Sequence, residues 1–189
     1  MLYLVEFTGP FGYLKPWTAV RDGKTNSLTF LTPSTVEGLR LKLGVSAIAR
    51  YRLRYAHIDV QQETTHARGW TPQGQGATRK GTRPRAVLLR GVLVQPVLVL
   101  AFASEEDAHL AAHQHLCLSR NEDVLLPDGH VRAAPVAEFE QLPGAELLSA
   151  GEDEPGAVLV GHNRYQDNAP MYGRLTITLR PAELSTDFS

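Results

Sequence analysis

Apolar and basic side chains alternate along residues 48–58 (IARYRLRYAHI), and this alternation restricts the local fold more than any other stretch does. Successive side chains of a β-strand point to opposite faces, so a period of two predicts a strand with one apolar and one basic face. The first residues of the stretch are also compatible with the end of a helix. The apolar positions are Ile48, Tyr51, Leu53, Tyr55 and Ile58, and the basic positions are Arg50, Arg52, Arg54 and His57.

The neighbouring segments predict an α+β fold. Residues 2–7 (LYLVEF) have the aromatic and branched side chains of a strand, whereas residues 8–32 hold too many glycines and prolines for a long regular element. A helix is expected from Pro33 to Gly44, because Thr32 is a good N-cap, proline suits the first helical position, and glycine ends helices. The other predicted core elements are strands at 86–94 and 97–103 and a helix over 105–119 that is capped by Ser104.

This order of elements is that of a ferredoxin-like βαββαβ domain, the architecture that also builds RNA-recognition domains. We therefore expect a ferredoxin-like, RNA-recognition-like core over residues 1–120. Residues 64–85 contain four glycines, two prolines and no acid, which predicts a long loop or an extended hairpin that projects as a thumb. Residues 121–189 hold short strands and turns, and we expect them to form a small C-terminal β lobe that completes or flanks the sheet.

Charge is divided unevenly along the chain, although the net charge is only −1. Residues 1–104 hold 14 lysines and arginines against 5 acids, whereas residues 105–189 hold 5 against 15. An exposed basic half would attract an anionic partner such as nucleic acid. The alternative is that folding interleaves the two halves, so that their charges neutralise one another.

Several other classes of protein are disfavoured. The only cysteine, Cys117, excludes an intrachain disulfide and a cysteine-only zinc site, and it indicates a reducing, cytoplasmic location. No signal peptide is recognisable, and no apolar run reaches the roughly 18 residues that a membrane span needs. His109 and His113 could share a helix face, but HLAAH lacks the glutamate of the zinc-protease motif. GQGATRKG lacks the GK[ST] ending of a phosphate-binding loop. Taken together, these missing patterns lead us to expect no metal ion, no cofactor and no membrane contact.

Basic and aromatic side chains gather in two segments that are rich in turn-forming residues. Cations neutralise phosphates and aromatic rings stack on unpaired bases, so both segments are candidate contacts for single-stranded RNA. The first segment leads into the predicted helix, whose N-terminus offers N–H groups to a phosphate. The alternative is that the first segment is a lid over an ordinary core, with Trp17 and Phe11 buried beneath it. The candidates are Lys15, Trp17, Arg21, Lys24, Ser34 and Thr35 in the first segment, Arg68, Trp70, Arg79, Lys80, Arg83 and Arg85 in the second, and Arg52 and Arg54 on the basic strand.

Two stretches, LVEFTGPFGYLKPWT and LTFLTPSTVEGLRLKLG, resemble the N-terminus of the CRISPR-associated Cas five proteins. The shared pattern is a strand, a glycine-proline turn with an aromatic residue, a lysine-proline pair, and a Ser/Thr helix entry with a closing glycine. The resemblance covers residues 2–44, continues loosely to about residue 105 and is architectural beyond that point.

The resemblance implies a non-catalytic subunit of a type I Cascade complex, from the RAMP superfamily of ferredoxin-like RNA-binding proteins. Such a subunit binds the 5′ handle of the CRISPR RNA (crRNA) in antiviral defence. It contacts the Cas seven backbone subunits and the large subunit, and target DNA passes nearby. Residues 64–85 would be the thumb, and the candidates in the first segment would hold the handle.

One branch of this family is a metal-independent endoribonuclease that processes precursor crRNA with a tyrosine, a lysine and a histidine. In this chain Lys80 is followed by glycine and no histidine lies beside it, which puts nuclease activity in doubt. If the activity exists, its candidates are Tyr55, His66 and Lys80. A third interpretation is a basic interaction domain that does not bind RNA.

Overall fold

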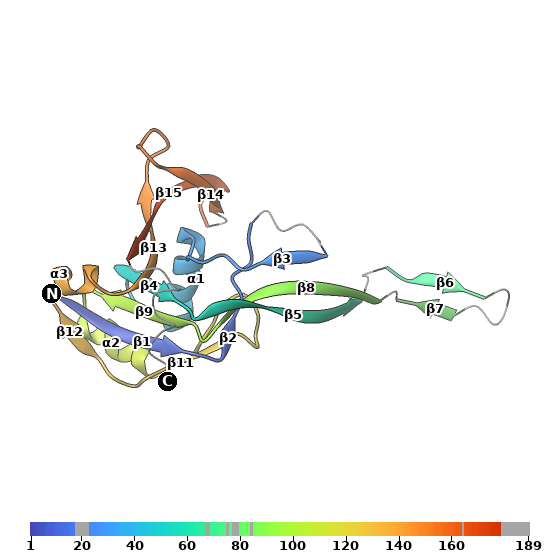
Figure 1. Ribbon diagram of the computed structural model, residues 1–189, viewed down its shortest axis with the longest axis horizontal. Coiled ribbons are helices and arrows are strands. Elements are labelled where there is room, and N and C mark those ends of the chain that lie inside the picture. The colour runs from blue at the N-terminus through green and yellow to red at the C-terminus, as the bar shows by residue number, and fades with distance from the viewer. Residues whose placement is uncertain are drawn as a thin grey trace.

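The computed structural model describes residues 1–17, 23–66, 69–74, 76, 80–83, 85–163 and 165–178. The fold of these residues is α+β, as the sequence predicts, with mostly antiparallel sheets (Figure 1). The largest sheet has the strand order β10-β11-β1-β9-β4-β13-β15-β14, and β12 pairs with β1 beside β11. Its strands are Leu2–Thr8 (β1), Arg50–Arg54 (β4), Val97–Phe102 (β9), Leu116–Cys117 (β10), Val124–Pro127 (β11), Arg132–Ala134 (β12), Gly144–Ala150 (β13), Val158–Asn163 (β14) and Ala169–Thr178 (β15).

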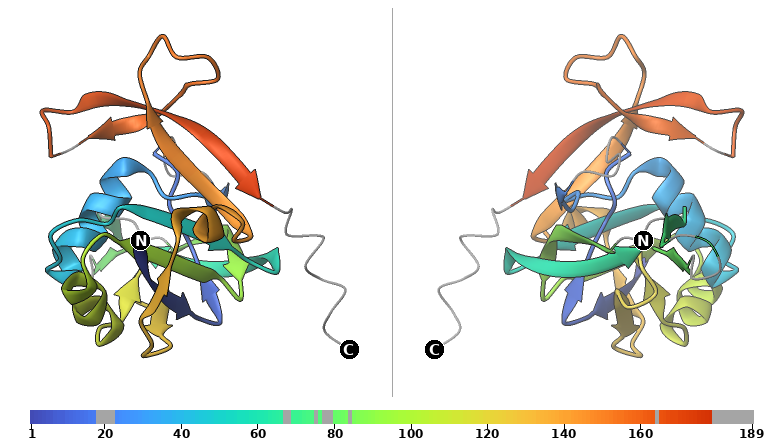
Figure 2. Two further views of the ribbon diagram at one scale, coloured as in Figure 1. Left: turned by 90° about the vertical axis from the view of Figure 1, so that its left-hand side faces the viewer. Right: turned by 90° about the vertical axis from the view of Figure 1, so that its right-hand side faces the viewer.

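Four neighbouring strands, β11, β1, β9 and β4, form the centre of this sheet and are antiparallel throughout. Helix α1 (Pro33–Leu43) lies between β1 and β4 in the chain, and α2 (Glu105–Ala112) follows β9. Among these four strands, each helix therefore lies in the chain between two strands that have one other strand between them in the sheet. Both helices cover the same face (Figure 2). Their buried side chains join one core cluster with those of the central strands, including Phe7 and Leu100.

Helix α1 begins and ends where the sequence predicts. Thr32 is extended and its hydroxyl accepts a hydrogen bond from the Thr35 N–H at 3.3 Å, which satisfies one of the free donors of the first turn. At the other end, Gly44 has φ of 69° and donates its N–H to the carbonyl of Arg40. This left-handed conformation favours glycine, so the predicted cap is confirmed.

Helix α2 is shorter than predicted. It starts after Ser104 as expected, but it ends at Ala112 rather than at residue 119. The Gln114 side-chain amide donates hydrogen bonds to the carbonyls of Leu43 and Leu110, at 2.8 and 3.2 Å, and ties the end of α2 to α1. The residues that follow pair with β11 as strand β10. Tertiary pairing has therefore overridden the helical pattern of the sequence.

The middle of the alternating stretch forms β4, whose two faces differ as predicted, but His57 and Ile58 begin β5 in another sheet, so the predicted single strand is two strands. Tyr51 and Leu53 are buried in the core cluster beneath the helices, whereas the arginines of β4 point to the opposite face. Residues 48 and 49 belong neither to a helix nor to a strand. On the opposite face, Phe139 of the short helix α3 (Val136–Glu140) packs against Leu2 and Leu4 of β1 in a smaller cluster.

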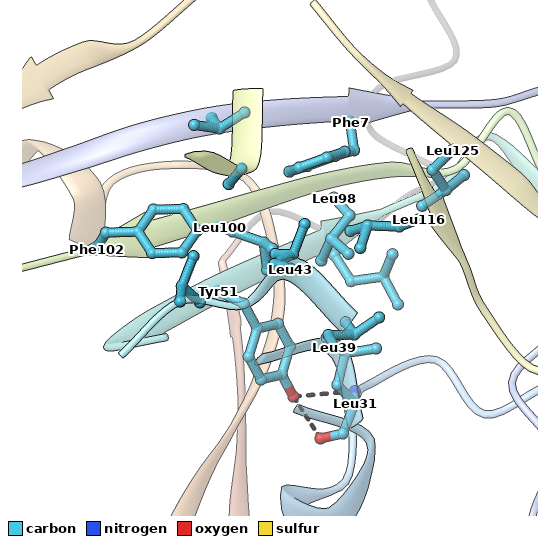
Figure 3. Close-up of a cluster of buried hydrophobic side chains, with 14 of the residues drawn as sticks. Phe7, Leu31, Leu39, Leu43, Tyr51, Leu98, Leu100, Phe102, Leu116 and Leu125 are labelled. Atoms are coloured by element: carbon cyan, nitrogen blue, oxygen red, sulfur yellow. Dashed lines mark hydrogen bonds between the residues drawn. The ribbon is translucent and has the colours of Figure 1, made fainter. Parts of the chain in front are cut away.

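The hydroxyl of Tyr51 connects three parts of the fold. It donates to the carbonyl of Leu31 at 2.8 Å and accepts from the N–H group of Leu31 at 3.0 Å (Figure 3). It also accepts from the N–H group of Leu147 at 2.7 Å. Burial raises the pKa of Tyr51 well above its ordinary value, so the phenol stays protonated. One side chain on β4 thus holds the entry to α1 and the start of the C-terminal hairpin.

Replacing Tyr51 with phenylalanine should lower the free energy of unfolding by about 1–3 kcal/mol, because buried backbone groups of Leu31 and Leu147 lose their partner. Urea denaturation measures the change. Tyr55→Phe is the matched control, since the Tyr55 hydroxyl makes no hydrogen bond within the described part of the chain. Equal loss in the two variants would contradict the role assigned to the Tyr51 hydroxyl.

A long arm projects from this sheet. Strands β5 (His57–His66) and β8 (Arg85–Val94) pair over ten residues each, a length of roughly 30 Å, and a small hairpin of β6 (Thr71–Gln73) and β7 (Lys80–Thr82) lies beyond them (Figure 1). At its base, β8 also pairs with β2 (Phe11–Gly12) and β3 (Lys24–Asn26). The projecting hairpin is longer than the predicted thumb over 64–85, because its strands extend back to residue 57 and on to residue 94.

Residues 121–178 supply β11, one of the four central strands, and add further strands on both sides of the centre. Strands β11 and β12 lie along β1, whereas β13 joins β4 through the single pair Ala145–Leu53. The hairpin of β13, β15 and β14 then rises away from the sheet (Figure 2). Because the sheet attaches it at so few backbone positions, side chains must hold this C-terminal hairpin in place.

Candidate nucleic-acid interface

The outer end of the arm presents an aromatic ring. Trp70 is 63% exposed, and its indole lies against Gly81 of β7, where a Cβ atom would come within 2.9 Å of the ring. Glycine at this position therefore gives the indole room to lie against the hairpin. The guanidinium of Arg83 lies over the same ring, 4.6 Å from its centroid, as a cation–π contact. The ring is thus held in place while most of its surface faces solvent.

The cations around Trp70 have no acidic partner. Lys80, Arg83 and Arg85 are exposed, and none of them forms an ion pair with a residue that the structure describes. His66 is exposed as well and lies opposite Arg85 in the β5–β8 ladder. We call Trp70, Lys80, Arg83 and Arg85 the arm tip. The predicted contacts Arg68 and Arg79 lie outside the described residues.

Cations at the base of the arm are engaged in structure instead. The guanidinium groups of Arg90 and Arg120 lie over the Tyr13 ring, 5.7 and 5.4 Å from its centroid. Arg120 also pairs with the buried Asp123 at 2.6 Å, and this hydrogen bonding raises the pKa of Arg120. Arg90 pairs with Glu63 at 3.2 Å. These contacts join β8 to the core and fix where the arm leaves the sheet.

The N-terminal candidates lie at the surface near this base. Lys15 and Lys24 are exposed and make no ion pair within the described ranges. Lys24 belongs to β3, which runs beside β8. Trp17 is 50% exposed, so it is not a residue buried beneath a lid. Arg21 lies outside the described residues.

The helix entry is a closed cap rather than an open phosphate site. The hydroxyls of Ser34 and Thr35 lie 3.1 and 2.9 Å from the Thr32 hydroxyl, within hydrogen-bonding distance. The N–H of Thr35 is also satisfied by Thr32. Ser34 and Thr35 thus contribute to the cap of α1, and their contact with RNA stays a prediction.

The two arginines predicted on β4 are neutralised by carboxylates. Arg52 is 4% exposed, pairs with the buried Glu146 and lies 5.0 Å from the centroid of the Phe139 ring. We remove Arg52 from the candidate RNA contacts, because a buried guanidinium cannot reach a phosphate. Arg54 is partly exposed but pairs with Glu6 at 3.7 Å. For β4, folding has interleaved the basic and acidic parts of the chain.

The candidate catalytic residues are not brought together. Tyr55 precedes β5 and His66 is its last residue, so roughly 30 Å of extended strand separates them. Burial raises the pKa of Tyr55, which is opposite to what a general base at neutral pH needs. Only His66 and Lys80 belong to the outer part of the arm. The predicted trio therefore does not form an active site.

The described residues hold no group of three or more histidine, cysteine, aspartate or glutamate side chains with the geometry to bind a metal ion. His109 is exposed on α2, and its Nε2 lies 3.9 Å from a Glu105 carboxylate oxygen. Among the described helices, none is long and apolar enough to span a membrane.

The fold resembles that of a known assembly component. The chain is similar to a solved structure titled "CRISPR RNA-guided surveillance complex", with a TM-score of 0.52 and 16% identity over 97% of this chain and 92% of that chain. A shared fold follows from that likeness. A second structure, "Crystal structure of Cas protein", has 17% identity over 94% of this chain and 95% of that one, but its TM-score of 0.43 carries no argument. No protein-family model and no curated protein sequence matches the chain.

Sequence reasoning missed one contact of Trp17. Its ring lies beside Gly161 and His162 of β14, about 145 residues further along the chain, with the Trp17 and His162 ring centroids 5.6 Å apart. The only local signal is an isolated glycine within a strand, which often marks a close approach of the backbone. The partner that makes this approach cannot be read from such a signal.

Proposed function

We propose that this chain is a non-catalytic, RNA-binding subunit of a type I CRISPR effector complex of the Cascade type. In this role it binds the 5′ handle of the crRNA in the cytoplasm and contacts the Cas seven backbone and large subunits, near the target DNA. The observation that carries the proposal is the arm tip, where Arg83 lies over an exposed indole and the outer strands of the arm carry two further exposed cations, all three without acidic partners among the described residues. Rings and free cations are what single-stranded RNA contacts require.

Two further observations support the proposal. The strand order β11-β1-β9-β4, with both helices on one face, is that expected of the ferredoxin-like core of a RAMP protein. Its fourth strand, β11, is Val124–Pro127, so on this proposal the core extends beyond the boundary at residue 120 that the sequence predicts. The fold likeness to a chain of an RNA-guided surveillance complex supports the same class. On this proposal the arm is the thumb, Lys15, Trp17 and Lys24 contact the handle, and Arg21, Arg68 and Arg79 remain proposed contacts. Residues 121–189 complete the sheet and offer surface to protein partners.

The chain, expressed with its neighbouring CRISPR subunits, should copurify with a short RNA of uniform 5′ end. Sequencing of the bound RNA measures this. Incubation of repeat RNA with the chain in EDTA then tests the endoribonuclease alternative, for which we expect no product ending in a 2′,3′-cyclic phosphate. RNA of random sequence, or none, would contradict handle binding, and a cyclic phosphate product would replace the binding role with an enzymatic one.

A further inference from the structure

We infer that Trp17 and His162 form a two-ring platform that stacks one unpaired base of the bound RNA, so that the C-terminal hairpin is part of the RNA site. The inference rests on the proposed function, because it adds a contact to the same site. Neither the N-terminal segment nor the hairpin contains this platform alone. It exists only because folding brings the loop after β2 against β14.

Trp17 packs directly against Gly161 of β14. Its φ of 141° favours glycine, and the pairing of β14 with β15 shifts register between Leu159 and Gly161. A Cβ atom at Gly161 would lie 3.5 Å from Cγ of Trp17 and 3.3 Å from Cε of Met171. The indole therefore packs against the backbone of β14, yet half of its surface stays exposed.

The two rings meet at a steep angle. The Trp17 and His162 centroids are 5.6 Å apart with an interplanar angle of 71°, and His162 is exposed. Because the two rings are steeply inclined, a base that stacks flat on one ring beside the other would turn its edge toward the face of that other ring. This corner gives a single base two surfaces, whereas an isolated ring gives it one.

Backbone hydrogen bonds and buried neighbours hold the β14 side of the platform in place. The turn after His162 is closed by hydrogen bonds from the N–H groups of Gln166 and Asn168 to the carbonyl of Asn163, both at 3.0 Å. Met171 is the cross-strand partner of Gly161, and Val160 precedes Gly161 on β14. Both side chains are buried in the core cluster. Binding therefore need not order these side chains, which lowers its entropic cost.

Charge around the platform favours RNA over a protein partner. Lys15 precedes Trp17 by two residues, is exposed and forms no ion pair with any described residue, so it can meet the phosphate next to a stacked base. Among the acids, Glu152–Glu154 precede β14 at the end far from His162, whereas Asp167 lies exposed in the turn that follows His162. A cation beside exposed rings suits a nucleotide better than an apolar protein surface.

The chain has two tryptophans, so Trp70→Phe leaves Trp17 as the only indole reporter. Titration of this variant with a short oligouridine RNA should quench Trp17 fluorescence. Trp17→Ala should weaken binding of a labelled copy of the RNA roughly 5- to 150-fold, and His162→Ala roughly 5-fold. His162→Phe should restore most of the affinity, because it restores a ring. The matched control His109→Ala, an exposed histidine on α2, should bind normally.

The outcomes separate this inference from the proposed function. RNA binding without a change in Trp17 emission, and at full affinity in Trp17→Ala, would overturn the platform and leave the proposed function standing. If His162→Ala keeps its RNA affinity but loses its protein subunits on copurification, the platform is a protein contact and the inference is wrong. Failure of the folded wild-type chain to bind RNA at all, with folding checked by circular dichroism, would remove both.

Discussion

Replacing Glu146 with alanine is expected to lower the free energy of unfolding by about 3–5 kcal/mol, because it leaves buried positive charge without a partner. Glu146 is 2% exposed and accepts hydrogen bonds from Arg50 Nε at 2.6 Å and Arg50 Nη2 at 2.7 Å, as well as from Arg52. Both guanidinium groups also lie over the Phe139 ring. Arg50 can turn to solvent when the carboxylate is lost, but Arg52, at 4% exposure, cannot.

The loss of stability in Glu146→Ala should be concentrated in the C-terminal hairpin. Strand β13 pairs with β4 only at Ala145 and Leu53, so the Glu146 cluster supplies much of the remaining attachment, together with Tyr51. Hydrogen exchange should therefore show β13, β14 and β15 opening before β1 and β9 in Glu146→Ala. Urea denaturation gives the size of the overall loss.

Glu140 provides a matched control. Its carboxylate lies 4.0 Å from the same Arg50, but its side chain is 54% exposed, so Glu140→Ala should cost only about 0–1 kcal/mol. Glu146→Gln keeps the shape and removes the charge, and it should still be strongly destabilised. If Glu146→Gln leaves the free energy of unfolding unchanged, the cluster stabilises the fold through packing and not through charge.

The sequence predicts those parts of the fold that local rules determine. Thr32, Pro33 and Gly44 define α1 because a cap, a fixed φ and a left-handed residue act within one turn of the chain. The alternation of β4 gives the correct faces for Tyr51 and Leu53, since the strand period depends on neighbouring residues alone. Nothing local shows that β13 joins β4 or that residues 116–117 leave the helical pattern, because both depend on pairing with distant strands.

The candidate site divides in the same way. The arm tip could be predicted because its cations are close in the chain and no acid lies among them. Arg52 has the same local pattern, but its partner Glu146 is 94 residues away in the chain. The sequence alone therefore makes Arg52 look like a free cation, although folding neutralises its charge. His162 shows the opposite case, a candidate contact that the sequence does not reveal. Its neighbours in the chain give no sign of RNA contact, and it becomes a candidate only because folding places it beside Trp17.

Replacing Lys80, Arg83 and Arg85 together with alanine is expected to weaken binding of single-stranded RNA about 100-fold at about 0.1 M salt, because each phosphate contact contributes roughly 0.7 to the salt slope. The slope of log affinity against log salt should therefore fall by about 2. Trp70 loses the cation above its ring in this variant but keeps its place against Gly81. Salt titrations of wild type and variant measure both quantities.

A matched triple variant separates position from net charge. Lys42, Arg132 and Arg174 are exposed cations on α1, β12 and β15, outside the arm. Their replacement with alanine removes the same three charges, so any effect of net charge alone would be equal in the two variants. We expect the salt slope of this control to stay within experimental error of wild type. If both variants lose the same slope, RNA responds to the overall charge of the chain, and the arm tip is not the binding site. If only the arm-tip variant loses it, the phosphates are contacted where the unpaired cations meet the indole.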